Sequence, residues 1–284
     1  MSKGGGYFLK TPDCGIVIDP GFNFIDNFIT AGHKFNEIDH VIITHAHNDH
    51  TADLESILIV LHEYNEAVLG DGHPSDANRT TIIQDIRDCI QDVSNMPNEE
   101  EIEKRAKREL AASPRRKRIR IYMSASTFKI FAPRFDLYKT SDYDIVIIKE
   151  TEKLPIRPPN QNDGPYRSDL TITAISAKHN DLQSDRDSLG FVFHSESKKY
   201  VLVYTGDTGY DSEIEDQYKE LKVKYSAYNV ILLAHLGGFK DYEKNFAAEK
   251  EMEMNWSSFY KNHLGRLGLA RLVEVLEPEI CIIS

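Results

Sequence analysis

Long apolar runs are absent from this sequence of 284 residues, and no stretch approaches the roughly 18–20 residues that a helix needs to cross a bilayer. The N-terminal segment, residues 1–6, has no apolar core of the kind that a secretory signal carries. Only three cysteines occur, Cys14, Cys89 and Cys281, and an odd number of widely spaced cysteines indicates no disulfide framework. These absences predict a protein of a reducing, cytoplasmic setting without a membrane anchor.

Positive charge is also in short supply, because the formal net charge is -11. A surface of that sign argues against broad, non-specific binding of nucleic acid. It does not exclude a phosphate substrate, since bound divalent cations would add positive charge inside a cleft. With 40% hydrophobic and 28% charged residues, the chain has the composition of a globular protein that buries a substantial core.

The most informative motif is the run THAHNDH at residues 44–50, which holds three imidazoles and one carboxylate. It lies between a strand-like apolar run, residues 41–43, and a segment with the apolar spacing of a helix, residues 49–64. Imidazole nitrogens and carboxylate oxygens are the ligands that suit zinc, iron and manganese. Histidines also occur on surfaces, but four ligand-type residues at this spacing favour a metal site: His45, His47, Asp49 and His50.

Runs of β-branched and aromatic residues between polar turns predict most of the strands. The expected strands cover residues 7–9, 14–18, 38–43, 119–123, 143–148, 170–174, 190–194, 200–204, 230–233 and 280–283. Besides 49–64, helices are expected after residue 207 and over 264–276, and the proline-rich stretch 155–165 is expected to be a loop. Because the strands come in two runs, each followed by helices, the pattern predicts an α/β fold with two sheets between helical layers.

Residues 71–120 differ in character from the rest of the chain. Helical spacing of isoleucines is followed by nine Lys/Arg against two Glu between Glu103 and Arg120. We interpret this region as a charged helical insertion outside the sheets. Its charges are either a solvated helix face or a basic flap, including Arg115 and Arg116, that holds a polyanionic substrate.

Further ligand-type residues stand at or just beyond the ends of expected strands. Ligands carried at strand ends by distant parts of a chain meet at one edge of a sheet, where loops build sites on a rigid scaffold. The candidates are Asp19, His179, Asp207, His235 and, before the last helix, His263.

Residues 45–50 match the H-x-H-x-D-H signature of the metallo-β-lactamase superfamily, and the chain resembles this superfamily outside residues 71–120. Asp19, in the run IDPG, is similar to the early strand-end aspartate of the family, and His179 is similar to its third-motif histidine. The run TGDT at 205–208 resembles the segment whose aspartate, here Asp207, bridges two metals. The resemblance implies a four-layer αββα sandwich of two mixed β-sheets flanked by helices, formed by residues 1–284 as a single domain.

The bridging position separates branches of this superfamily. Drug-degrading β-lactamases carry a cysteine or similar ligand there, whereas glyoxalase-II-like, lactonase and phosphodiesterase branches carry aspartate, as this chain does at Asp207. The C-terminal third is most similar to the phosphodiesterase branch that includes the tRNA 3′-processing endonucleases, with His235 and His263 as the first two of three histidine segments. The third, a metal ligand, would fall at about residue 285, one step past Ser284, so we expect a truncated domain or a replaced ligand.

The resemblance implies two divalent metal ions, zinc, manganese or iron. His45, His47 and His179 would form the first metal site, Asp49 and His50 the second, with Asp207 bridging both. Asp49 would also orient a metal-bridging hydroxide, and His263 would donate a proton to the leaving group or contact a phosphate. Supporting or substrate-binding roles are expected for Asp19, which would accept a ring N–H from a ligand histidine, and for His235, Arg115 and Arg116.

We therefore predict a binuclear metal-dependent hydrolase, a phosphodiesterase that acts on a small-molecule or nucleic-acid phosphodiester, with a homodimer left open. The first alternative is a carboxylic (thio)ester hydrolase of the glyoxalase or lactonase type, because the ligand set is the same. The second is a non-catalytic nucleotide- or metal-binding domain of a larger complex.

Overall fold

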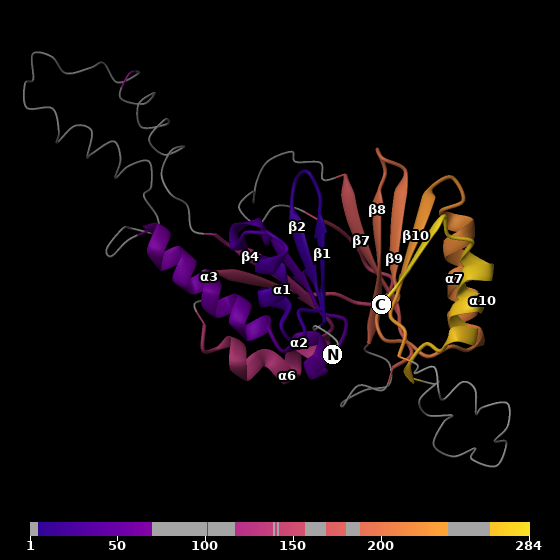
Figure 1. Ribbon diagram of the computed structural model, residues 1–284, viewed down its shortest axis with the longest axis horizontal. Helices are drawn as coiled ribbons and strands as arrows, with labels where there is room; N and C mark the ends of the chain where they lie inside the picture. The colour runs from indigo at the N-terminus through magenta and orange to yellow at the C-terminus, as the bar shows by residue number, and fades with distance from the viewer. Residues whose placement is uncertain are drawn as a thin grey trace, which may run out of the picture.

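The structure is a computed structural model that describes residues 5–69, 101, 117–138, 140, 142–156, 169–179, 188–237 and 262–284. Two sheets lie face to face, with helices on both outer sides (Figure 1). The first sheet has the order β1 (Tyr7–Lys10), β2 (Gly15–Ile18), β3 (His40–Ile42), β4 (Ile119–Met123), β5 (Tyr143–Ile147). The second has the order β11 (Ile280–Ile283), β10 (Asn229–Ala234), β9 (Tyr200–Tyr204), β8 (Leu189–Ser195), β7 (Leu170–Ser176), β6 (Lys153–Pro155).

Both sheets are mixed. Strands β2 to β5 are parallel to one another and β1 is antiparallel to β2. In the second sheet β9, β10 and β11 are parallel, while β6 to β9 pair antiparallel. The four-layer αββα sandwich of two mixed sheets is therefore confirmed.

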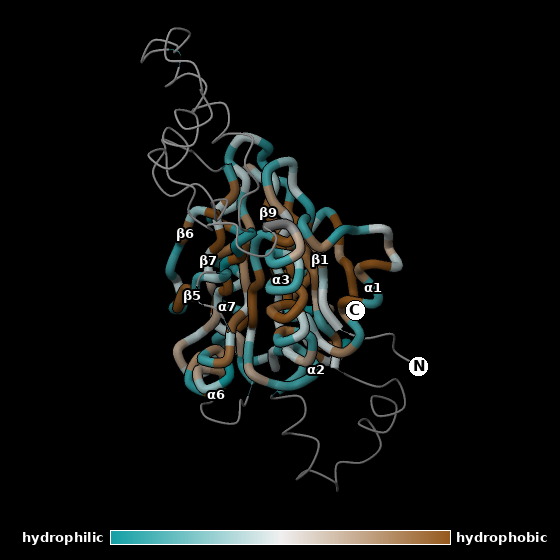
Figure 2. Tube along the Cα trace, turned by 90° about the vertical axis from the view of Figure 1, so that its left-hand side faces the viewer, coloured by the Kyte–Doolittle hydropathy of each residue, from teal (hydrophilic) through white to brown (hydrophobic). Residues whose placement is uncertain are grey.

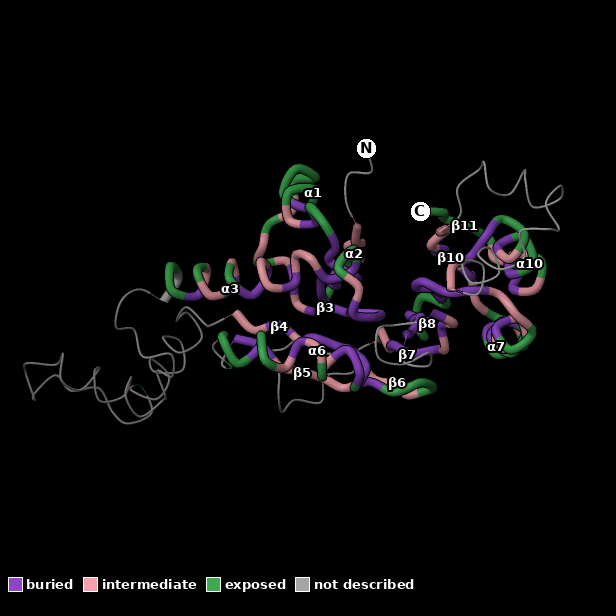
Figure 3. The backbone as a smooth tube through the Cα atoms, turned by 90° about the horizontal axis from the view of Figure 1, so that it is seen from below, coloured by how far each residue is buried: buried purple, intermediate pink, exposed green. Residues whose placement is uncertain are grey.

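Alternating side chains divide the apolar interior into three layers, as the period of two along a strand requires. Ile16, Ile18, Phe191 and Phe193 face the space between the sheets, whereas the residue between each pair, such as Val17, faces the helices. The brown stretches of Figure 2 and the buried residues of Figure 3 follow these strands through the middle of the molecule. The core therefore runs between the sheets and beneath each helical layer.

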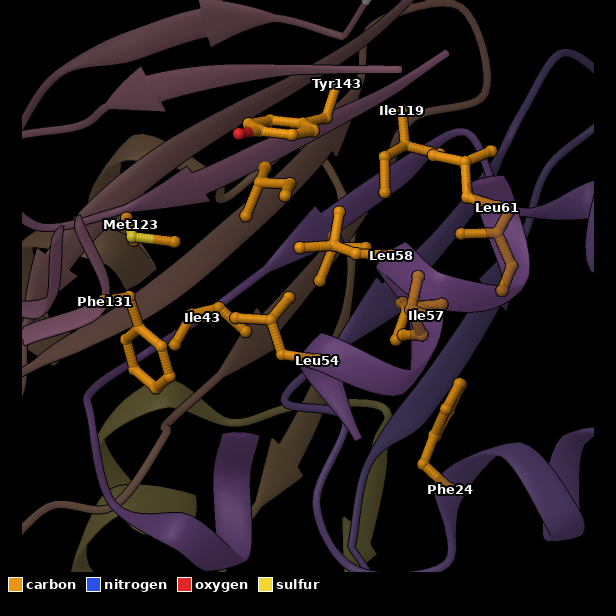
Figure 4. Packing of buried hydrophobic residues seen from close by; sticks show 14 of the residues in the cluster. Phe24, Ile43, Leu54, Ile57, Leu58, Leu61, Ile119, Met123, Phe131 and Tyr143 are labelled. Carbon is orange, nitrogen blue, oxygen red and sulfur yellow. The ribbon is translucent and has the colours of Figure 1, made fainter. Parts of the chain in front are cut away.

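The helices are distributed over the two outer faces. Helices α1 (Phe24–Thr30), α3 (Leu54–Leu69) and α6 (Ala125–Phe135) pack on the first sheet, where Leu54, Ile57, Leu58 and Leu61 of α3 meet residues of the strands (Figure 4). Helices α7 (Ser212–Lys224) and α10 (Arg266–Leu276) pack on the second sheet. Within the described ranges, no helix is both long and apolar enough to cross a membrane.

Two expectations need correction. The helix expected over 49–64 is two helices, α2 (Asn48–Thr51) and α3, because the Asp53 N–H donates to the Pro20 carbonyl at 2.9 Å. Pro155 ends β6 rather than beginning a loop. The strand expected over 119–123 is β4, which directly follows the insertion predicted at about residues 71–120. Apart from Glu101 and residues 117–120, the region 71–120 lies outside the described residues.

Helices α1 and α6 had no counterpart among the expected elements. Asn23, which precedes helix α1, has a left-handed backbone conformation and makes no side-chain capping hydrogen bond. The first turn of α1 is capped instead by Asp53 from beyond β3, which accepts from the Ile25 N–H at 2.9 Å. A cap supplied from 28 residues away leaves no local signal in the sequence.

Candidate metal centre

The ligand-type side chains converge at the edge where the parallel strands of both sheets end. His45 and His47 follow β3, His179 follows β7, and Asp207 follows β9. His235 directly follows β10. Separate strands thus supply the groups, while the sheets hold their backbones in place.

Three overlapping groups of side chains have the composition and spacing of metal sites. In each group the potential ligand atoms lie within 4.8 Å of one another. The groups are His45–His47–His179, His45–His50–Asp207 and His179–Asp207–His263. The structure therefore brings five of the six predicted ligands together and adds His263, which was expected to act as a proton donor or phosphate contact.

The separations of the donor atoms fit ligands that share an ion. Two ligands about 2.0–2.2 Å from a tetrahedral ion lie about 3.3–3.6 Å apart. The Asp207 Oδ2 atom lies 3.3 Å from Nε2 of His50 and 3.3 Å from Nε2 of His263. His179 Nε2 lies 3.1 Å from His47 Nδ1, and His45 Nε2 lies 4.0 Å from Asp207 Oδ2. The residues present thus have donor types and separations that suit divalent cations, with the Asp207–His50 and Asp207–His263 pairs at the expected distance.

Hydrogen bonds at the far side of the rings decide which nitrogen faces the centre. His179 Nδ1 lies 2.7 Å from the Asn262 carbonyl oxygen, which only accepts, so Nδ1 carries the proton and Nε2 carries the lone pair. His45 Nδ1 lies 3.0 Å from the Thr44 hydroxyl, whose proton is donated to Asp19 at 2.8 Å. The ring of His45 must then donate through Nδ1. Its buried Nε2 has no hydrogen-bond partner among the described residues, as expected of an atom that coordinates a metal.

Asp19 lies behind the first ligand segment. It is 2% exposed, and its Oδ1 accepts from the Thr44 N–H at 2.8 Å. Its Oδ2 lies 3.0 Å from His50 Nδ1. A carboxylate at this nitrogen orients the ring so that Nε2 points at Asp207. Asp19 therefore belongs to none of the three groups but contacts His50, a member of one of them.

Burial and charge favour a cation here. Burial opposes the charged form of His50, but the carboxylates of Asp19 and Asp207 outweigh it and raise the pKa of His50 to about 11. Burial also favours the neutral form of Asp207, yet hydrogen bonds from His263 and His50 hold the pKa of Asp207 well below its usual range. Burial and then the neighbouring His50 lower the pKa of His45, which stays neutral and competent as a ligand. In the metal-free protein, a proton on His50 thus occupies a position that electrostatically suits a cation.

His235 and His263 form the outer side of the centre. His235 Nε2 lies 3.4 Å from Asp207 Oδ1, and its Nδ1 lies 3.3 Å from the Ser284 hydroxyl. The backbone of Gly237 packs closely against the His263 side chain. A Cβ atom at residue 237 would lie only 2.5 Å from the His263 Cβ. With 32% and 27% of their side chains exposed, the two histidines are accessible from solvent, unlike His45.

Other predicted site residues are placed less directly. The Asp49 side chain is 62% exposed, its Oδ2 lies 3.7 Å from His50 Nε2, and it belongs to none of the three groups. Arg115 and Arg116 lie outside the described residues. The sequence interpretation missed the supporting roles of Thr44, Asn262 and Ser284. Their only signal was proximity to a candidate histidine, because a hydroxyl or a backbone carbonyl has no distinctive pattern.

Comparisons with known proteins show similarity in sequence motif and in fold. The sequence model of the Metallo-beta-lactamase superfamily matches residues 6–60, which include β1 to β3, Asp19 and the histidine run. No curated protein matches the chain. The metallo-beta-lactamase fold protein YhfI from Bacillus subtilis superposes with a TM-score of 0.58 at 13% identity, over 99% of this chain and 77% of that one.

Two further solved structures are similar over 99% of this chain. The short form of human tRNase Z (ELAC1) has a TM-score of 0.53 at 11% identity, with 89% of its chain covered. A diphosphatase from the PhnP family has a TM-score of 0.51 at 10% identity, with 73% covered. At such identities the likeness establishes the fold. The chain thus has the metallo-β-lactamase fold, and the match over residues 6–60 supports the metallo-β-lactamase superfamily as its family.

Proposed function

We propose that this protein is a metal-dependent hydrolase that cleaves phosphodiester bonds in a nucleotide- or RNA-type substrate. The observation that carries the proposal is the convergence of five histidines and the buried Asp207 at one edge of the sandwich, with donor atoms at ligand spacing. Two of the similar solved structures are named as a tRNase Z and a diphosphatase. These names support a phosphodiester substrate for this chain.

The ligands divide into two ion positions. His45, His47 and His179 would hold one divalent cation, and His50 with Asp207 would hold the other, with Asp207 shared. Zinc, manganese and iron all suit this donor set. When bound, such cations supply Lewis-acid polarisation of the phosphoryl group and an acidified water as the nucleophile.

Partly or fully exposed side chains beside the centre would transfer a proton, orient the attacking water and contact the substrate. His263 is partly exposed and its Nε2 lies 3.3 Å from Asp207, so it would present a proton to the leaving oxygen of a bound diester. Asp49, exposed beside His50, would orient the attacking water. The chain would form one domain, and Arg115 and Arg116 of its insertion would contact a polyanionic substrate. A cytoplasmic location would give the protein access to such substrates.

The experiment compares esters of different classes on one preparation. The protein is freed of metal with a chelator, reloaded with zinc or manganese, and assayed on bis-p-nitrophenyl phosphate, a thioester and a lactone. We expect turnover of the diester only, and loss of that turnover in His179→Ala. His33→Ala is the matched control, because His33 lies before β3, at the other end of that strand from the histidine run, and pairs with Glu37.

The outcomes separate the candidate functions. Turnover of the thioester or lactone without turnover of the diester would replace the proposal by the carboxylic hydrolase. Failure to retain any metal, with no hydrolysis of any ester, would leave a non-catalytic binding domain.

A further inference from the structure

Asp19 receives more hydrogen-bond donors than support of one histidine requires. Its Oδ1 accepts from the Thr44 N–H and its Oδ2 accepts from the Thr44 hydroxyl, both at 2.8 Å. The same Oδ2 lies 3.0 Å from His50 Nδ1. Through Thr44 the carboxylate is also linked to His45, so one buried side chain lies against or is linked to a histidine of each proposed ion position.

A further donor comes from the other sheet. Tyr204, the last residue of β9, is fully buried, and its hydroxyl donates to Asp19 Oδ2 at 2.9 Å. The two residues are 185 positions apart in the chain. The ring of Tyr7 packs edge-on against Tyr204 with centroids 5.4 Å apart, which restricts sideways movement of the phenol.

The position of Tyr204 in its strand gives this bond a second consequence. Asp207 follows Tyr204 by three residues, so the strand end that carries Asp207 is tied to the carboxylate that orients His45 and His50. The distances from Asp207 Oδ2 to Nε2 of these histidines, 4.0 Å and 3.3 Å, depend on how the second sheet is held against the first. A hydrogen bond between the sheets at this point restrains that distance directly.

We propose that Tyr204 is a positioning residue of the metal centre, which acts through Asp19 to hold the ligands of the two sheets at metal-binding distance. Thr44 is its counterpart on the first sheet and transmits the position of Asp19 to His45. The inference rests on the proposed function only in that the centre binds divalent cations. It requires no particular substrate.

The test removes single hydroxyl groups without changing the shape of the side chain. Tyr204→Phe deletes the bond to Asp19, and Thr44→Val deletes the link to His45 while Thr44→Ser retains it. Tyr143→Phe is the matched control, because the buried Tyr143 hydroxyl donates to the Phe135 carbonyl at 2.8 Å, in the core of the first sheet. Each full-length variant is measured without metal for its melting temperature, and with zinc for its dissociation constant by competition with a chromogenic chelator.

We expect Tyr204→Phe and Thr44→Val to weaken zinc binding about 10-fold or more, as loss of a group behind a ligand usually does. Tyr143→Phe and Thr44→Ser should bind zinc as the wild type does, although Tyr143→Phe should lower the melting temperature as much as Tyr204→Phe. Cobalt-substituted Tyr204→Phe should show an altered d–d spectrum. In the metal-free protein, ¹⁵N ring shifts should show His45 protonated at Nδ1, and Thr44→Val should change that signal.

Equal zinc affinities and cobalt spectra for the wild type and Tyr204→Phe would overturn the inference. A wild type that binds zinc but cleaves no diester would overturn the proposed function and leave this inference standing if Tyr204→Phe binds zinc more weakly. A wild type that binds no divalent cation would overturn both.

Discussion

Acidification should destabilise this protein through a histidine remote from the metal centre. His40, the first residue of β3, is completely buried, and its Nε2 has no hydrogen-bond partner among the described residues. Its Nδ1 lies 3.5 Å from the Tyr122 hydroxyl. Burial, reinforced by the positive charges of Arg120 and Lys117, lowers the pKa of His40 to about 3 from an ordinary value of 6.5.

The sign and size of the effect follow from this difference. The unfolded chain binds a proton at residue 40 below pH 6.5, whereas the folded protein resists it down to about pH 3. Stability is therefore intact above pH 6.5 and is lost as the pH falls through that interval. At pH 5, proton binding at residue 40 in the unfolded chain raises the unfolding equilibrium constant by a factor of about 30. This corresponds to a loss of about 2 kcal/mol in unfolding free energy relative to pH 7.

Urea unfolding of metal-free protein, followed by far-ultraviolet circular dichroism at pH 7 and pH 5, measures this loss. His40→Gln does not titrate, so the difference in unfolding free energy between wild type and variant should shrink by about 2 kcal/mol from pH 7 to pH 5. His33→Gln, which removes a partly exposed imidazole, is the control. A difference between wild type and His40→Gln that is the same at both pH values would refute the reasoning.

Three further predictions concern the centre and the binding of its substrate. Asp207→Ala should abolish turnover and weaken metal binding at least 100-fold, measured by elemental analysis after dialysis, because Asp207 contributes to two of the three groups. Gly237→Ala should displace His263 and reduce kcat about 100-fold, measured with the metal content of the same preparation, and unchanged kcat would remove His263 from the reaction. Arg115→Ala combined with Arg116→Ala should raise KM for a polyanionic substrate but not for a small diester, whereas an unchanged KM for both would return these charges to a solvated face.

The sequence contained most of the strand assignments, because most strands are short runs of β-branched and aromatic residues between polar turns. It also contained the types of the ligands. Residues 45–50 are crowded with imidazoles, and Asp207 lies at a strand end, so metal chemistry was readable before any geometry was known. The αββα architecture followed from two runs of strands and from the resemblance that these motifs carry.

Local pattern failed where the stabilising partner is distant. Helix α1 depends on a cap from Asp53, and the break between α2 and α3 depends on a hydrogen bond to Pro20. Neither partner is a neighbour in the sequence, so no window of residues reveals them.

Only the tertiary structure decided how the ligands meet. The sequence names His45 and Asp207, which 161 residues separate, but it cannot show that their side chains lie 4.0 Å apart, since strand order and sheet packing determine that distance. It also could not show which ring nitrogen faces the centre, because that depends on Thr44 and on the Asn262 carbonyl. Residue types determine what chemistry a chain has available. The packing of two sheets determines which of those groups share a site, because hydrogen bonds and metal coordination act only over a few ångströms.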